Sequence, residues 1–347
     1  MDGERPGRGK LGWTIIVVVV AAATSLAAQA EPGRRVSLGR YSLNIYCSGR
    51  GAPVVVVETG LGDFAFDWAL VQQRVEQRHR ICTYDRAGYA SSDMGPAPRT
   101  FAQLNLELHE LLRRAGEKPP YVLVGQSFGG AVVRNYAASY PDEVAGMVLA
   151  ESVAEHQPLV FGGKAVLLKD SATGKPISQP NLSGEIPVIQ GTAKNAPEEP
   201  LPDVYFALPV WLQQLHRQFS TKPELDAAES SQRDWSAEYF AAWDRVPQTG
   251  LLGAKPLIVM TRAASGYEAG ANYSLEQVDG QRLRAQTELL TLSSNSVQII
   301  LRRGHNLHLE APDAVAWAID AVATAASRHA PLLGVAPVPS APATGGK

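Results

Sequence analysis

Residues 121–130 read Tyr121-Val122-Leu123-Val124-Gly125-Gln126-Ser127-Phe128-Gly129-Gly130. An apolar run rich in β-branched residues ends in Gly-x-Ser-x-Gly, and a helix-like segment, 131–140, follows it. Strand, tight turn and helix in this order are the context in which the motif forms a nucleophile elbow. The flanking glycines permit a strained turn, and a helix N-terminus beside the serine favours negative charge. The pattern predicts Ser127 as a covalent nucleophile; the alternative is a glycine-rich turn with an incidental serine.

Length and composition describe an ordinary globular protein. The chain has 347 residues, enough for one large α/β domain with an insertion or for two small domains. Its hydrophobic content is 45% and its charged content 19%. The net charge is −2, and no basic cluster with interleaved aromatic residues occurs, which argues against a nucleic-acid partner. We therefore expect a small-molecule substrate.

The first thirty residues have the features of an export signal. Arg5, Arg8 and Lys10 precede the apolar run 11–23, and Ala28-Gln29-Ala30 has the small-x-small pattern of a cleavage site. We predict a signal peptide over residues 1–30, cleaved after Ala30. The alternative is an uncleaved membrane anchor, because residues 11–28 are at the short limit for crossing a bilayer. Both interpretations place the folded part outside the cytoplasm, either periplasmic or secreted.

Strand-like and helix-like segments alternate along the rest of the chain. Residues 31–151 and 256–328 are predicted to form the two parts of an α/β core, with a mostly parallel sheet and helices on both faces. Residues 152–255 break this rhythm with proline-rich and aromatic segments, and we interpret them as an inserted helical cap. Residues 329–347 are rich in Pro, Ala and Gly and are predicted to be disordered.

The predicted elements of the core follow from the spacing of apolar residues. Expected strands lie at 53–58, 80–84, 121–124, 146–150, 257–260 and 297–301, after a strand pair at 35–47. Expected helices lie at 67–78, 100–115, 131–140, 274–290 and 311–326, and Thr100 is the expected N-cap of the second of these.

A serine nucleophile needs a base. His305 follows the last predicted strand on a glycine-containing loop and precedes the last helix. Its place after Ser127 agrees with the chain order serine, acid, histidine of one large hydrolase class. His308 is the nearest competitor, and its alternative role is packing at the start of a helix.

The acid that orients the base has two candidates. Glu151 directly follows the strand 146–150, at the carboxyl edge where open α/β sheets place their sites. The loop after 257–260 offers no carboxylate before Glu268. We choose Glu151 and keep Glu268 as the runner-up. The alternative role of Glu151 is a solvated carboxylate that caps the first helix of the cap.

A tetrahedral intermediate also needs donors for its oxyanion. The N–H of Phe128 is one candidate, and the N–H of Leu61 in Thr59-Gly60-Leu61-Gly62-Asp63 is the other, because glycines on both sides let the backbone approach closely. The alternative is a plain glycine turn.

Over about residues 35–327 the chain resembles the serine hydrolases of the α/β-hydrolase fold. The resemblance rests on the elbow, the glycine turn 59–62, the segment 84–92 and Gly304-His305. It implies an eight-stranded α/β sheet with an inserted cap. The sequence departs from the family at Ala90, at Thr59 where many members have His, and in the empty acid position after the seventh strand. The last departure resembles the subset whose acid follows the sixth strand, a place that Glu151 fills.

The resemblance also implies that the second strand lies beside the fourth. Cys47 would then neighbour Cys82, and we hypothesise a disulfide between them. The alternative is a pair of small buried cysteines.

The resemblance implies acyl transfer to Ser127, with no cofactor and no metal needed. The apolar, aromatic cap points to a carboxylic ester of a small to medium, partly lipophilic molecule. An aminopeptidase or amidase of the same fold is the first alternative. A non-catalytic binding domain is the second, because the same fold serves that purpose when the triad is broken.

Overall fold

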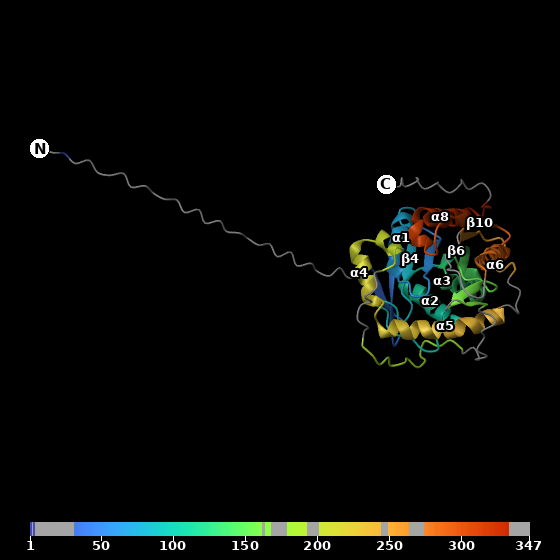
Figure 1. Cartoon of the computed structure of the whole chain (residues 1–347), viewed down its shortest axis with the longest axis horizontal. Helices are drawn as coiled ribbons and strands as arrows, with labels where there is room; N and C mark the ends of the chain where they lie inside the picture. The colour runs from blue at the N-terminus through green and yellow to red at the C-terminus, as the bar shows by residue number, and fades with distance from the viewer. Residues whose placement is uncertain are drawn as a thin grey trace. The chain divides into compact units, whose positions relative to one another are not determined.

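An eight-stranded sheet runs through the computed structural model (Figure 1). The strand order is β1-β2-β4-β3-β5-β6-β9-β10; β1 and β2 pair antiparallel, as do β2 and β4, and the remaining neighbours are parallel. This confirms the predicted mostly parallel sheet. The strands are β1 (Arg34–Ser37), β2 (Ser42–Ser48), β3 (Val54–Glu58), β4 (Ile81–Tyr84), β5 (Tyr121–Gln126), β6 (Val144–Ala150), β9 (Leu257–Arg262) and β10 (Ser296–Leu301).

The structure describes residues 1, 3, 31–161, 164–167, 179–192, 201–243, 249–263 and 274–332. The predicted signal peptide, apart from residues 1 and 3, lies outside these ranges, as do the runner-up acid Glu268 and residues 333–347. Within them, no helix is both long enough and apolar enough to cross a bilayer.

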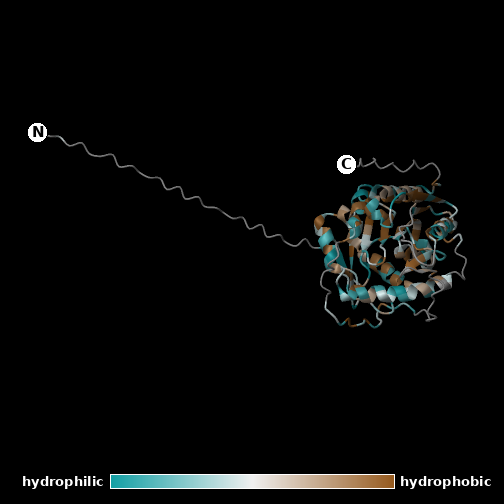
Figure 2. Ribbon diagram, in the orientation of Figure 1, coloured by the Kyte–Doolittle hydropathy of each residue, from teal (hydrophilic) through white to brown (hydrophobic). Residues whose placement is uncertain are grey.

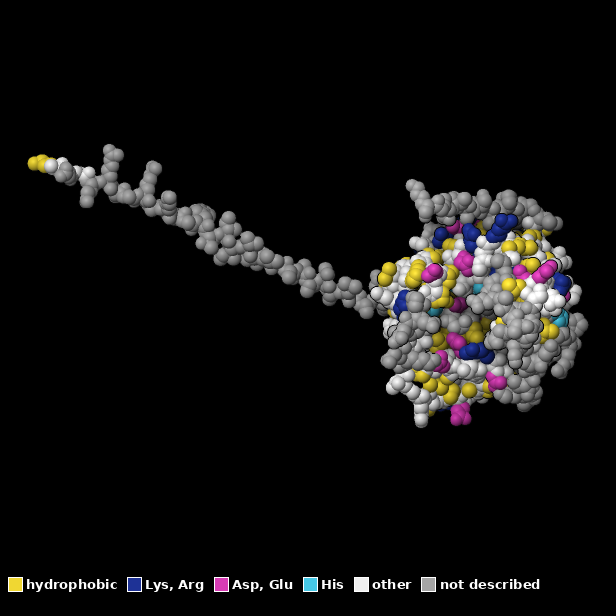
Figure 3. Space-filling view, viewed as in Figure 1, with side chains coloured by type: hydrophobic (Ala, Val, Ile, Leu, Met, Phe, Trp, Pro, Cys, Tyr) yellow, Lys and Arg dark blue, Asp and Glu magenta, His cyan; other side chains and the backbone are white. Residues whose placement is uncertain are grey.

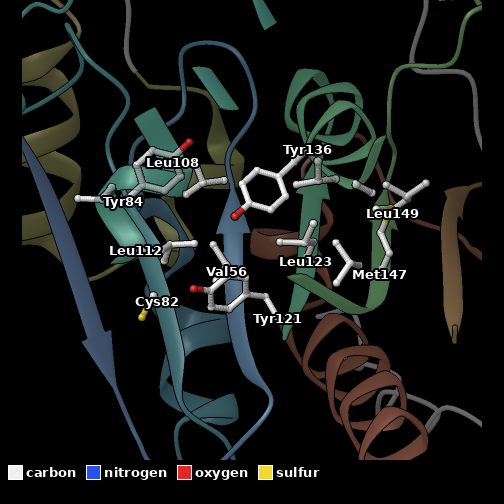
Figure 4. Close-up of a cluster of buried hydrophobic side chains, with 14 of the residues drawn as sticks. Val56, Cys82, Tyr84, Leu108, Leu112, Tyr121, Leu123, Tyr136, Met147 and Leu149 are labelled. Atoms are coloured by element: carbon white, nitrogen blue, oxygen red, sulfur yellow. The ribbon is translucent and has the colours of Figure 1, made fainter. Parts of the chain in front are cut away.

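Helices cover both faces of the sheet because its central strands are apolar on both sides. Along β3, Val54 and Val56 pack with the helices of one face, and Val55 and Val57 pack with those of the other, as the two-residue repeat of a strand requires. Figure 4 shows the first of these layers around Val56 and Leu123, and Figure 2 shows the strands as hydrophobic. The first face carries α2 (Phe101–Ala115), α3 (Phe128–Ser139) and α6 (Leu275–Glu288), and the second carries α1 (Ala69–Val75) and α8 (Pro312–Arg328).

Short elements and caps complete the core. The predicted N-cap is confirmed, because the Thr100 hydroxyl accepts from the Gln103 N–H at 3.1 Å. The predicted helix over 67–78 is shorter than expected, since a 3₁₀ turn replaces its beginning. The short helices are η1 (Ala65–Trp68), η2 (Pro141–Glu143), η5 (Leu289–Leu292) and α7 (Leu307–Glu310).

The described part of the cap contains helices, as predicted, and also a small sheet that was not predicted. Its elements are β7 (Pro158–Phe161), β8 (Lys164–Leu167), η4 (Asp203–Ala207), α4 (Val210–Phe219) and α5 (Pro223–Trp243). β7 and β8 pair antiparallel. A Gly162-Gly163 pair between two apolar runs is a hairpin signal that the sequence carried.

The predicted disordered tail begins too early. Leu332 is buried, and its N–H donates to Asn295 Oδ1 at 2.8 Å. Asn295 Nδ2 in turn donates to the carbonyl of Ala330 at 3.3 Å. Residues 329–332 therefore belong to the folded core, because one apolar side chain and one asparagine are enough to fix them.

The structure contains a disulfide between Cys47 and Cys82. The two residues lie directly opposite each other on β2 and β4. The bond closes a loop between residues that are 35 positions apart and ties the antiparallel edge to the parallel core. On the surface seen in Figure 3, basic and acidic side chains are interspersed, in keeping with the small net charge.

Candidate active site

The turn between β5 and α3 has the backbone of a nucleophile elbow. Ser127 has φ +52° and ψ −121°, a strained conformation for a residue with a side chain. A Cβ on Gly129 would lie 2.2 Å from the carbonyl oxygen of Glu58, and one on Gly125 would lie 2.6 Å from Gly130 Cα. The glycines of the motif are therefore required by close packing between β3, β5 and α3.

Ser127 lines a cavity of about 500 Å³ between the carboxyl edge of the sheet and the cap. Leu61, Phe128 and His305 line the same cavity, so the structure brings four of the predicted site residues together. A larger cavity of about 840 Å³ lies at the amino ends of β6, β9 and β10. Because open α/β sheets bind ligands at the carboxyl ends of their strands, the Ser127 cavity is the candidate active site.

Glu151 lies beside His305 at the end of β6. Its Oε2 is 3.7 Å from His305 Nδ1, which is close but longer than a hydrogen bond. Its backbone, like that of Ser127, has a positive φ, +47°. Glu151 is almost fully buried, so it is not the solvated cap residue that was the alternative. Catalytic hydrogen bonds are often long before substrate binds and shorten in the complex.

Two arginines hold the Glu151 carboxylate in place. Glu151 Oε1 accepts from the backbone N–H of Arg262 at 2.7 Å and lies 3.1 Å from Arg282 Nη1. Glu151 Oε2 lies 3.0 Å from the side-chain Nε of Arg262. Arg282 is itself fully buried and pairs with Asp279 at 2.8 Å. Such partners offset the cost of burying a carboxylate. Oε2, which Arg262 Nε also approaches, is the oxygen that lies 3.7 Å from His305 Nδ1.

His308, the competing base, has a packing role. It is fully buried, and its ring stacks on the Trp68 indole at a centroid distance of 4.9 Å. Burial lowers the pKa of His308 to about 3, so the ring is neutral at physiological pH. Among the described residues neither ring nitrogen has a hydrogen-bond partner.

The proposed oxyanion donors also meet at this cavity. Phe128 is the first residue of α3, where backbone N–H groups lack intrahelical partners and the helix dipole is positive. Leu61 lies in the turn after β3. Within the described residues, neither N–H has a hydrogen-bond acceptor.

Several polar residues of the site were missed at the sequence level. Arg262 lies two positions after the predicted strand 257–260, so its place at the sheet edge was readable. Arg282 lies within a helix pattern and gave no such signal. Behind the Leu61 turn, Asp63 accepts from the Tyr205 hydroxyl at 3.0 Å, and Asp67 lies 3.0 Å from His216 Nδ1.

These buried pairs between core and cap are unusual electrostatically. Burial, followed by the nearby Asp67 charge, raises the pKa of Asp63 to about 6. Burial lowers the pKa of His216, but the adjacent Asp67 outweighs it, and the net shift is upward.

Comparison with known proteins agrees with this architecture. A family model described as "alpha/beta hydrolase fold" matches residues 52–166. The enol-lactonase from Burkholderia xenovorans LB400 superposes with a TM-score of 0.57 at 17% identity, covering 84% of this chain and 100% of that one. A thermophilic esterase from Thermogutta terrifontis gives 0.55 at 17% identity, covering 83% and 96%.

This chain has the α/β-hydrolase fold. An AB hydrolase superfamily protein of Gibberella zeae is 32% identical over 114 residues, which are 31% of this chain and 35% of that protein. The chain spans from 16% to 46% of the length of eight curated relatives that it matches. The α/β-hydrolase fold hosts many activities, so chemistry must be argued from the site.

Proposed function

We propose that the protein is a serine hydrolase that cleaves a carboxylic ester through an acyl-enzyme on Ser127. The observation that carries the proposal is the strained Ser127 turn, which lines one cavity together with His305, Leu61 and Phe128. A strained backbone at a serine in a cavity that a histidine also lines fits a nucleophile held for reaction.

The mechanism uses only residues of this site. Ser127 Oγ attacks the acyl carbon while His305 takes the hydroxyl proton. The N–H groups of Leu61 and Phe128 bind the oxyanion of the tetrahedral intermediate. The ester C–O bond then breaks, His305 gives the proton to the departing alcohol, and the acyl group remains on Ser127. Water, deprotonated by His305, then attacks the acyl carbon and forms a second tetrahedral intermediate. When this collapses, the bond to Ser127 Oγ breaks, the serine takes the proton back from His305, and the acid leaves; Glu151 stabilises the imidazolium each time it forms.

The cavity supports a small to medium, partly lipophilic substrate. Its volume of about 500 Å³ lies within the usual range for small-molecule pockets. Leu61, Phe128, Leu159 and Phe240 give it apolar walls. An aminopeptidase or amidase would use the same machinery, and a non-catalytic binding domain would use the cavity alone.

We further propose that the folded part is exported, either to the periplasm or to the outside, with an N-terminal anchor as the alternative. The leader-like residues 1–30 support this. The disulfide between Cys47 and Cys82 supports it too, because such bonds persist in oxidising compartments.

A fluorophosphonate probe tests the function directly. We expect the purified protein to be labelled at Ser127, and Ser127→Ala to lose both labelling and ester hydrolysis, the latter by at least about 10⁴-fold. A panel of ester, lactone, amide and aminoacyl substrates then ranks the acyl bonds. Folded protein that neither labels nor hydrolyses any of them would favour the binding domain, and full activity in Ser127→Ala would overturn the proposal.

A further inference from the structure

Arg86 lies buried beneath the turn that carries Leu61. It follows β4 closely, and its side chain is 1% exposed. Arg86 Nη1 donates to Glu58 Oε1 at 2.6 Å, and Glu58, at the end of β3, is fully buried too. Two opposite charges at these positions neutralise each other, so the pair can reside in the core.

Arg86 also bonds the oxyanion turn, residues 59–62, through two backbone carbonyls and, at 3.3 Å, the Thr59 hydroxyl. Nη1 donates to the carbonyl of Thr59 at 2.9 Å, and Nη2 donates to the carbonyl of Gly60 at 2.7 Å. A planar guanidinium therefore holds two successive carbonyl groups in fixed directions, which the single ammonium of a lysine does not reproduce.

The direction of the Gly60 carbonyl decides the direction of the Leu61 N–H. The two groups belong to one planar peptide, and this peptide is trans. In a trans peptide the C=O and the N–H point in opposite directions. With its carbonyl bound to Arg86, the peptide turns its N–H away from Arg86, and Leu61 is the residue of this turn that lines the Ser127 cavity.

The same guanidinium contacts the elbow. Its central carbon lies 5.5 Å from the centroid of the Phe128 ring and 4.4 Å from that of Tyr89. One buried cation thus touches both segments whose N–H groups are the proposed oxyanion donors.

We propose that Arg86 is the positioning residue of the oxyanion hole. It fixes the Gly60–Leu61 peptide so that the Leu61 N–H faces Ser127, and its positive charge beside the Gly60 oxygen polarises the peptide and strengthens that N–H as a donor. Arg86 does not touch the substrate. The catalytic part of this inference rests on the proposed function; the orientation of the peptide does not.

Arg99 provides a matched control. It is as deeply buried as Arg86, its guanidinium pairs with one carboxylate, Glu107, at 2.6 Å, and its Nε also lacks a partner among the described residues. Its remaining side-chain bond goes to the carbonyl of Pro96, outside the oxyanion turn. Arg86→Lys and Arg99→Lys therefore damage the core in similar ways, and only the first removes the grip on the Gly60–Leu61 peptide.

The test combines a structural and a kinetic readout. In protein labelled with ¹⁵N-leucine, the Leu61 amide resonance, assigned with Leu61→Ile, is expected to move in Arg86→Lys and to stay in Arg99→Lys. With active sites counted by fluorophosphonate titration, kcat is expected to fall about 10- to 100-fold in Arg86→Lys while KM changes little, below the loss for a deleted donor. Binding of a boronic acid, which mimics the tetrahedral intermediate, should weaken by the same factor as kcat.

Each result decides one part. An unmoved Leu61 resonance in Arg86→Lys overturns the positioning role whatever the kinetics. Equal kcat per labelled site in Arg86→Lys and Arg99→Lys overturns its catalytic consequence. A moved resonance in a protein that neither labels nor hydrolyses keeps the positioning role and rejects the proposed function instead.

Discussion

The Ser127 cavity lies between two regions that are built in different ways. We call the carboxyl edge of the sheet the floor and the cap, residues 152–255, the roof. On the floor, backbone bonds between neighbouring strand ends hold the site: the Ser127 N–H donates to Ala150 at 3.2 Å, and the Glu151 N–H donates to Met260 at 2.9 Å. The roof is joined to the core through side-chain pairs between segments that are more than 140 residues apart, such as Tyr205 with Asp63 and His216 with Asp67. The floor thus depends on strand order, and the roof on individual polar partners.

Of the variants that test this comparison, Glu151→Gln, on the floor, has the largest expected effect. The amide keeps the shape of the side chain but does not stabilise a charged His305, so kcat should fall on the order of 10³-fold or more. The variant also leaves Arg262 and Arg282 short of a carboxylate, which should lower the free energy of unfolding by roughly 3–5 kcal/mol. Steady-state kinetics per labelled active site, together with urea unfolding, measure the two effects separately.

Asp279→Asn is the control for that variant. It also takes a carboxylate from Arg282, at a position that does not face His305, and should leave kcat within a few-fold. A nearly normal kcat in Glu151→Gln would show that Glu151 is not the acid of the triad, and Glu268 would then be the candidate.

The same contrast explains how much of the site could be predicted from sequence. Ser127, His305 and Glu151 each follow a strand or a strand loop, and parallel strands bring their carboxyl ends to one edge, so local patterns sufficed to group them. Arg86 falls in the segment 84–92, but its role could not be predicted, because the sequence does not show where its guanidinium points. Arg282 and the pairs between cap and core were missed, because a residue within a helix pattern carries no sign of a partner more than a hundred positions away.

An intermediate effect is expected at the junction between roof and core, from Asp63, which accepts from Tyr205 of the cap. Its folded-state pKa is raised to about 6 from an ordinary value of 3.8, so ionising it costs free energy in the folded state. Protonated Asp63 therefore stabilises the folded state. Its contribution to the free energy of unfolding is complete below about pH 4 and is lost as the pH rises through 6. His216, whose pKa is also raised, is stabilising below its ordinary 6.5 and loses that contribution as the pH rises further. Both changes weaken the junction between cap and core at higher pH.

Asp63→Asn should flatten this dependence. Between pH 4 and 7 the variant is expected to lose less stability than the wild type, by on the order of 1–3 kcal/mol. Urea unfolding at several pH values measures the difference, and Asp203→Asn, on the exposed face of η4, should keep the wild-type curve. Asp67, Tyr205 and His305 also face the Asp63 carboxyl. If the stability of Asp63→Asn falls with pH in parallel with that of the wild type, Asp63 does not cause the pH dependence.

The smallest expected effect concerns the substrate selectivity that side chains of the roof give to the cavity. Arg233 on α5 lines the cavity, with a side chain 56% exposed and its nearest carboxylate, that of Glu229, at 3.2 Å. Among the described residues that line this cavity, the ionisable ones are Arg233, Arg262 and His305, and none is acidic. We therefore expect an ester with a distal carboxylate to be hydrolysed faster than its neutral analogue of equal length.

Arg233→Met tests whether the cap's charge, and not its shape alone, chooses the substrate. Methionine keeps an unbranched apolar stem but removes the charge, so kcat/KM for the acid-bearing ester should fall about 5- to 10-fold while that for the neutral ester holds, since a partly exposed ion pair is worth about 1 kcal/mol. Arg217→Met, on α4 and away from the cavity lining, should change neither value. If the ratio of kcat/KM for the acid-bearing ester to that for the neutral ester is the same in Arg233→Met and the wild type, the roof selects by apolar contact alone. Selectivity would then depend on Leu159 and Phe240, and the polar pairs of the cap would serve only to attach it.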